Sequence, residues 1–158
     1  MKRIFRFFAI TFFLLGIASC GGDGYNSPGP NPNPTTVTYK ATLNGSNEFP
    51  AVTSSAMGNA TLTFNNTTKA FTINVTHNVV NPTMAHIHRG LAGSSPANNI
   101  VFELTSTSAT TYTLSGTLNA AQEADLKAVP ELYYVNIHST AHSTGEIRGQ
   151  LVEYVAPY

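Results

Sequence analysis

Residues 71–76, with the sequence Phe71-Thr-Ile73-Asn-Val75-Thr, alternate apolar and polar side chains without a break. Successive side chains of a β-strand point to opposite faces of a sheet, so this alternation predicts a strand with one buried face. His77 follows at the end of the segment, and we expect it to be an exposed strand residue. The segment therefore indicates a β fold class rather than a helical one.

Seven further segments show the same alternation, with Asn, Gly, Pro and Ser residues between them. They are residues 37–43, 60–64, 84–88, 100–104, 112–118, 132–138 and 146–154. Together the segments predict an all-β fold, an antiparallel sandwich or barrel of about eight strands. One short helix is expected at residues 119–127, because Asn119 can act as the N-cap and Gln122 stands at the capping-box position.

Composition argues against several classes of protein. Only 10% of the 158 residues are charged, and the formal net charge is zero. Soluble domains typically carry roughly 25% charged residues, so neither a basic nucleic-acid-binding face nor a charge-rich coiled coil is expected. The length fits one folded domain. The sequence contains no Gly-x-Ser-x-Gly elbow and no phosphate-binding loop, which argues against hydrolase and transferase chemistry.

The N-terminal segment has the organisation of an export signal. Three basic residues lie within the first six positions and precede a mainly apolar run, residues 7–18, that is too short for a permanent membrane span. The run leads into Ile-Ala-Ser-Cys20, which resembles the lipobox of bacterial lipoproteins, in which the cysteine is acylated and becomes the new N-terminus. Residues 1–19 are therefore predicted to be a lipoprotein signal peptide and Cys20 the lipidation site. The alternative is an ordinary signal peptide followed by an incidental cysteine.

The predicted mature protein consists of a tether and one domain. Residues 20–36 are rich in Gly, Pro and Asn and are expected to hold the domain of residues 37–158 away from a membrane. Lipid on Cys20 would anchor the protein in the bacterial cell envelope, most simply at the outer membrane, facing the periplasm or the cell surface. Loss of the signal peptide leaves five basic and eight acidic residues, so no nucleic-acid partner is expected. Cys20 is the single cysteine, which excludes an intramolecular disulfide.

Alternation also predicts which way the histidines face. His86 and His88 share one face of their segment with Met84, opposite the apolar side chains between them, and His138 lies on the corresponding outer face of residues 132–138. Two histidines at i and i+2 with a third from another strand can hold copper or zinc. The three histidines are therefore the predicted metal ligands of a surface patch. The alternative is that these imidazoles only form hydrogen bonds to neighbouring loops.

Other polar residues are weaker candidates. Met84, His142 and Glu146 are potential supplementary ligands. Glu48, Glu146 and Arg148 are expected to have structural roles, in a buried ion pair or in contacts along the sheet. Because metal ligation needs neutral imidazoles, the affinity for a metal should fall as the pH drops through about 6.5.

Five segments of the sequence carry a family resemblance. They are residues 43–50 (LNGSNEFP), 58–60 (GNA), 85–90 (AHIHRG), 134–138 (YVNIH) and 145–151 (GEIRGQL). In this order they resemble the CHRD domain, a module named for its repeats in chordin that also occurs singly in bacterial secreted proteins. The resemblance spans roughly residues 38–152 and implies little about activity, since in chordin the module belongs to an extracellular growth-factor binder.

A second resemblance concerns the histidines. The pair His86 and His88, His138 on a late strand and Arg148 in a Gly-rich segment resemble the copper site of copper/zinc superoxide dismutase, a Greek-key barrel. This implies a superoxide-dismutase-like Greek-key fold and a substrate-steering role for Arg148. The strand pattern alone also fits an immunoglobulin-like Greek-key sandwich. The chain departs from that family, because no histidine lies between His88 and His138 to bridge two metals and a single cysteine cannot form the family disulfide.

Two functional classes therefore remain open. The first is an exported, lipid-anchored CHRD-domain protein that acts as an extracytoplasmic binding or structural module, with a protein or glycan partner. The alternative is a copper- or zinc-binding protein, either a carrier or a minimal superoxide-dismutase-like oxidoreductase. The sequence favours the first class, because a His-x-His pair is by itself a weak signal for a metal site.

Overall fold

The computed structural model describes residues 35–95 and 100–156. The predicted signal peptide, the Cys20 lipidation site and almost all of the predicted tether lie outside the described residues. The described residues belong to one compact unit. None of the helices in this part of the chain is long and apolar enough to cross a membrane.

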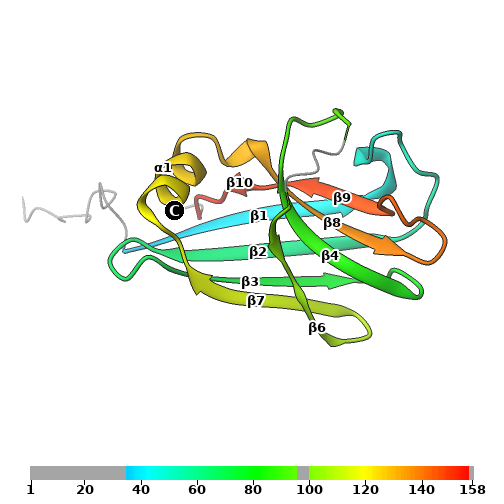
Figure 1. Ribbon diagram of the computed structural model, residues 1–158, viewed down its shortest axis with the longest axis horizontal. Helices are drawn as coiled ribbons and strands as arrows, with labels where there is room; N and C mark the ends of the chain where they lie inside the picture. Colours follow the sequence, from blue (N-terminus) through cyan, green and yellow to red (C-terminus); the bar gives the residue numbers. More distant parts are fainter. Residues whose placement is uncertain (1–34, 96–99, 157–158) are drawn as a thin grey trace, which may run out of the picture. The chain divides into compact units, whose positions relative to one another are not determined.

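The described residues form ten strands and three short helices (Figure 1). The strands are β1 (Thr36–Asn44), β2 (Met57–Asn65), β3 (Ala70–His77), β4 (Pro82–Arg89), β5 (Ile100–Glu103), β6 (Thr105–Ser108), β7 (Thr111–Thr117), β8 (Tyr133–Ser139), β9 (Ile147–Gln150) and β10 (Val152–Glu153). The helices are η1 (Gly45–Asn47), α1 (Ala120–Ala128) and η2 (Pro130–Leu132). All strand pairs are antiparallel.

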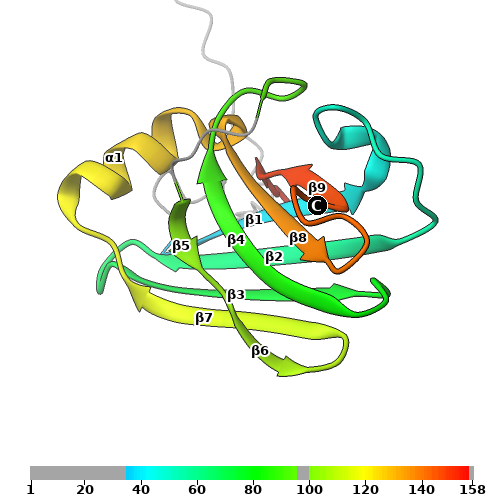
Figure 2. The same ribbon diagram turned by 45° about the vertical axis from the view of Figure 1, so that its right-hand side comes forward.

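One sheet contains all of these strands in the order β5-β4-β8-β9-β1-β2-β3-β7-β6, and β10 pairs with β1 outside this path. β5 and β6 stand at the two ends of the order, although only Leu104 separates them in the chain. The sheet must therefore curl until its ends meet, and Figure 2 shows β5 running directly into β6. Leu104 is buried at this corner, and its backbone N–H donates to the carbonyl oxygen of Ala85 at 2.9 Å. The result is a nearly closed barrel.

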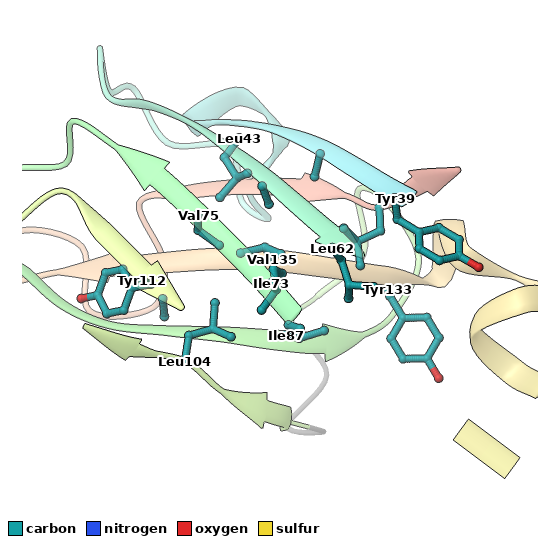
Figure 3. Packing of buried hydrophobic residues seen from close by; sticks show 14 of the residues in the cluster. Tyr39, Leu43, Leu62, Ile73, Val75, Ile87, Leu104, Tyr112, Tyr133 and Val135 are labelled. Carbon is teal, nitrogen blue, oxygen red and sulfur yellow. The ribbon is translucent and has the colours of Figure 1, made fainter. Parts of the chain in front are cut away.

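Alternation along the central strands sends every second side chain into the barrel. In β3, Phe71, Ile73 and Val75 are buried, whereas the residues between them are exposed. Figure 3 shows Ile73 and Val75 meeting Ile87 of β4 and Val135 of β8 in the centre of the core. Complete burial of aliphatic and aromatic side chains of this size contributes roughly 1.5–3 kcal/mol each. Because one face of β4 and β8 packs into this core, the side chains on their other face point away from it.

The prediction that His77 is exposed is wrong. Its side chain is buried, its ring stacks on Tyr112 with the centroids 5.4 Å apart, and its Nδ1 accepts a hydrogen bond from the backbone N–H of Val79 at 3.2 Å. Burial lowers the pKa of His77 below the usual histidine value, because the charged form loses its hydration. Since His77 is two residues after Val75, the alternation of β3 itself indicated an inward direction.

Helix α1 begins at the predicted cap. The Asn119 side chain accepts a hydrogen bond from the backbone N–H of Gln122 at 2.9 Å, and the Gln122 side chain accepts one from the backbone N–H of Asn119 at 3.0 Å. Later in the helix, Asp125 accepts hydrogen bonds from the Arg89 guanidinium at 2.7 Å and from the Tyr133 hydroxyl. These bonds attach the helix to the end of β4 and the start of β8.

The predicted fold class, an all-β antiparallel sandwich or barrel with one short helix, is confirmed. The eight predicted segments all contain strands, with ends that differ by a few residues. β6 is absent from the prediction because all four of its residues are polar and exposed, so no alternation marks it. The last predicted strand is divided into β9 and β10 at Leu151, which is buried and donates its N–H to the carbonyl oxygen of Tyr133.

Candidate metal centre

Strands β4, β8 and β9 are neighbours in the sheet and carry the predicted site residues. Residues that lie directly opposite each other on paired strands project from the same face of a sheet. The register pairs four sets of such residues: Met84 with His138, His86 with Asn136, His88 with Tyr134, and Asn136 with Arg148. We call the face that carries them, opposite to the core, the outer face.

The outer face is buried around the histidines, so the predicted surface patch is wrong in that respect. His86, His88 and His138 are only 6%, 6% and 8% exposed. Two loops contact the face, the β8–β9 turn through the carbonyl oxygen of Ser143 and the segment after β4 through that of Leu91. Alternation predicts the direction of a side chain, but it does not show whether a loop covers that side chain.

His86 and His138 form a hydrogen-bonded pair. Nδ1 of His86 lies 3.2 Å from Nε2 of His138, and Nδ1 of His138 lies 2.9 Å from the carbonyl oxygen of Ser143. A carbonyl oxygen only accepts, so Nδ1 of His138 carries the hydrogen, and in the neutral ring the lone pair on Nε2 points towards His86. A hydrogen bond from the far ring nitrogen to a backbone carbonyl is the usual means of orienting a metal-binding imidazole.

His88 lies close to this pair, so that three histidines converge. One ring nitrogen each from His86, His88 and His138 lies within 4.8 Å of the other two. Two imidazole nitrogens bound to one tetrahedral ion are about 3.3 Å apart, which matches the His86–His138 separation of 3.2 Å. The third nitrogen, that of His88, would have to approach the other two by at most about 1.5 Å on binding. The predicted ligand set is therefore brought together by the fold.

Burial favours the neutral form of His86. Desolvation is the main cause that lowers the pKa of His86, the neighbouring His138 lowers it further, and Glu103 acts in the opposite direction. Glu103 of β5 is the direct strand partner of His86, and sequence analysis missed it because only the strand register brings the two together. A neutral imidazole keeps a lone pair available for a metal at neutral pH.

Three side chains form a stack beside the histidine pair. The His88 ring lies on Tyr134 with centroids 5.1 Å apart and planes 14° apart, and the guanidinium carbon of Arg148 lies 3.5 Å from the Tyr134 centroid. Arg148 is 1% exposed and donates to the carbonyl oxygens of Leu91 at 2.7 Å and Ser94 at 3.1 Å. Because these bonds occupy the guanidinium and attach the segment after β4, the geometry favours the structural role of Arg148 over substrate steering.

Glu48 is a buried carboxyl near Arg148. Desolvation raises its pKa to about 7, against the attraction of Arg148 and a hydrogen bond from the Phe49 backbone. Gly145, with φ of +131°, makes room for it, since a Cβ at that position would lie 2.6 Å from Oε1 of Glu48. Among the described residues, no carboxylate oxygen lies within 4.0 Å of Arg148, so the expected ion pair of Glu48 or Glu146 with Arg148 is not a contact pair.

The predicted supplementary ligands differ in their positions. Glu146 accepts a hydrogen bond from the Ser54 hydroxyl at 2.7 Å, and His142 is half-buried in the β8–β9 turn. Neither belongs to the group of converging nitrogens. Met84 shares the outer face with the three histidines, and together with His86 it lines a pocket at the junction of β5 and β6.

Comparison with known proteins identifies the domain. Residues 39–151 match the family model of the CHRD domain, whereas no curated protein and no solved structure matches the chain. The match covers more than half of the chain, includes all five segments that suggested the resemblance, and extends from β1 through β9. The chain therefore belongs to the CHRD domain family.

Proposed function

We propose that this chain is an exported, lipid-anchored CHRD-domain protein that binds one transition-metal ion, copper or zinc, through His86, His88 and His138 and catalyses no reaction. The observation that carries the metal site is the convergence of three ring nitrogens within 4.8 Å on two paired strands. The hydrogen bond from His138 to Ser143 supports it, because that bond orients the ring and directs the opposite nitrogen, Nε2, towards His86, where an ion would replace the His86–His138 hydrogen bond.

The chemistry of the donor set limits which ions fit. Three imidazoles suit copper and zinc, whereas magnesium and calcium need oxygen ligands that this group of atoms does not supply. Three protein ligands also leave one position of a tetrahedral ion for another group. A binding role is therefore chemically consistent with the residues present.

Arg148 supports a non-catalytic role. A superoxide-dismutase-like oxidoreductase would need an arginine that an anionic substrate can reach, whereas the guanidinium of Arg148 is buried and donates to two backbone carbonyls. We therefore favour a metal-binding protein over an oxidoreductase.

A structural module is the second candidate. The observation that favours it is the direct hydrogen bond between His86 and His138, which satisfies one nitrogen of each ring without a metal. In that case the outer face is a polar network that stabilises the barrel, and a protein or glycan partner binds elsewhere on the domain.

Calorimetric titration with Zn(II) and Cu(II) tests the metal site. The full-length chain would carry Cys20→Ser, which removes its one thiol as a competing ligand. We expect one ion per chain and a loss of affinity of about tenfold or more in each of His86→Ala, His88→Ala and His138→Ala. His142→Ala is the matched control, because this histidine lies in the adjoining turn but outside the ligand group. Absence of binding, or equal affinity in all four variants, would leave the structural module.

Fractionation of cells tests the lipid anchor. Cys20→Ser should move the protein out of the membrane fraction, because lipid on that residue is the only proposed anchor. Ser27→Ala, a substitution in the predicted tether, should leave the fractionation unchanged. Membrane association that survives Cys20→Ser would contradict the lipoprotein part of the proposal.

A further inference from the structure

Met84 occupies the exposed edge of the candidate metal centre. It is 47% exposed, whereas the three histidines on the same face are almost completely buried. Its direct strand partner is His138, and it precedes His86 by two residues on β4. Opposed residues of an antiparallel pair have Cβ atoms about 4.5–5.5 Å apart, so the flexible Met84 side chain is within reach of both rings of the His86–His138 pair.

The approach to the site also passes Met84. The pocket at the junction of β5 and β6 is lined by Met84, His86 and Glu103 together with residues of the barrel seam. On the other side, the segment after β4 is bonded to Arg148 and the β8–β9 turn is bonded to His138. An ion that enters by the pocket therefore meets the Met84 thioether beside the His86 ring.

The three ligating residues give a dication no negative charge, because they are imidazoles and not carboxylates. Glu103, the strand partner of His86, is the one carboxylate among the described residues that lines the entry pocket, and it does not belong to the ligand group. The buried Arg148 cation lies on Tyr134, which in turn stacks on His88, and no carboxylate of the described residues forms a contact pair with it. The cost of moving an ion out of water rises with the square of its charge, so a monovalent ion loses only about a quarter of the solvation energy that a dication of equal size loses.

We infer that the centre is selective for Cu(I) and that the Met84 thioether is its fourth ligand, an inference that rests on the proposed metal-binding function. Thioether and imidazole ligands suit Cu(I), which is both soft and monovalent. The site thus combines a soft fourth donor at its entrance with a neutral, buried set of three nitrogens.

Competition for Cu(I) with bicinchoninate under anaerobic conditions tests the inference. The full-length chain carrying Cys20→Ser would be compared with the same chain carrying Met84→Leu, and Zn(II) affinity would be measured in parallel. We expect Met84→Leu to weaken Cu(I) binding by about tenfold or more and to change Zn(II) affinity by less than about twofold. Met57→Leu is the matched control, since Met57 is also exposed, at 55%, but begins β2.

The outcomes separate this inference from the function on which it rests. Copper-edge X-ray absorption should show one sulfur scatterer in the parent chain and none in Met84→Leu. Cu(I) affinity that Met84→Leu leaves unchanged, or Zn(II) binding tighter than Cu(I) binding in the parent chain, would overturn the inference while the three-histidine site stands. Failure of all three ions, Cu(I), Cu(II) and Zn(II), to bind would overturn both.

Discussion

The two faces of strand β8 are both buried, but by different physical means. On the inner face, Val135 and Ile137 pack among apolar side chains of the barrel core. On the outer face, Tyr134, Asn136 and His138 lie among rings, a guanidinium and loop carbonyls. Apolar burial needs only contact area, whereas polar burial needs a partner at the correct distance and angle for each group. The outer face therefore depends on loops and register in a way that the core does not.

Among the substitutions considered, we expect the largest loss of stability from removing the Arg148 side chain on the outer face. Arg148→Ala should lower the free energy of unfolding by roughly 4 kcal/mol, because it removes charge-assisted hydrogen bonds to Leu91 and Ser94 and leaves a cavity on Tyr134. Urea denaturation measures the loss. Arg89→Ala is the matched control, since Arg89 also donates two hydrogen bonds but lies on the surface, and its effect should be much smaller. Equal losses in the two variants would contradict the structural role of Arg148.

A somewhat smaller loss of stability is expected from a substitution on the inner face. Ile137→Ala should cost about 3 kcal/mol, because Ile137 is completely buried and the barrel cannot close around the missing atoms. Zinc or copper affinity should stay within about twofold of the parent value, because Ile137 points away from the histidines. Val152→Ala on the exposed strand β10 serves as the control for denaturation. Metal binding lost together with stability would show that the two faces are not separable.

The buried carboxyl of Glu48 should make the stability of the protein depend on pH. Glu48 has a pKa of 4.5 when unperturbed and about 7 in the folded protein, so the folded state holds this proton more tightly than the unfolded state. The raised pKa of Glu48 therefore contributes to the stability of the folded state at low pH, and this contribution is lost as the pH rises from about 4.5 to about 7. Relative to Glu48→Gln, which cannot titrate, the parent chain should lose on the order of 2 kcal/mol between pH 4.5 and 7.5. Denaturation at a series of pH values tests this, and a constant difference between the two proteins would contradict the raised pKa.

The parts of the structure that depend on a local pattern could be predicted from the sequence. The inward direction of Ile73 and the Asn119 capping box follow from neighbouring residues, and both are confirmed. β6 carries no such pattern and could not be predicted. The burial of His77 could have been predicted from the alternation of β3, so the expectation that it is exposed was an error of interpretation.

The candidate site could be predicted only in part. The identity of the three histidines and their common face came from alternation on two segments. Their convergence required the register of β4 against β8, and their burial required the loops that reach Ser143 and Leu91. Glu103 meets His86 only through the pairing of β5 with β4. Register and loop position arise from the whole fold, so no short segment contains them.

Anomalous diffraction from crystals soaked in copper or zinc would decide whether the outer face of β4 and β8 is a metal centre. We expect one peak about 2.0–2.1 Å from a ring nitrogen of each of His86, His88 and His138. A peak at His142 or His77 instead, or no peak at the three histidines, would contradict it.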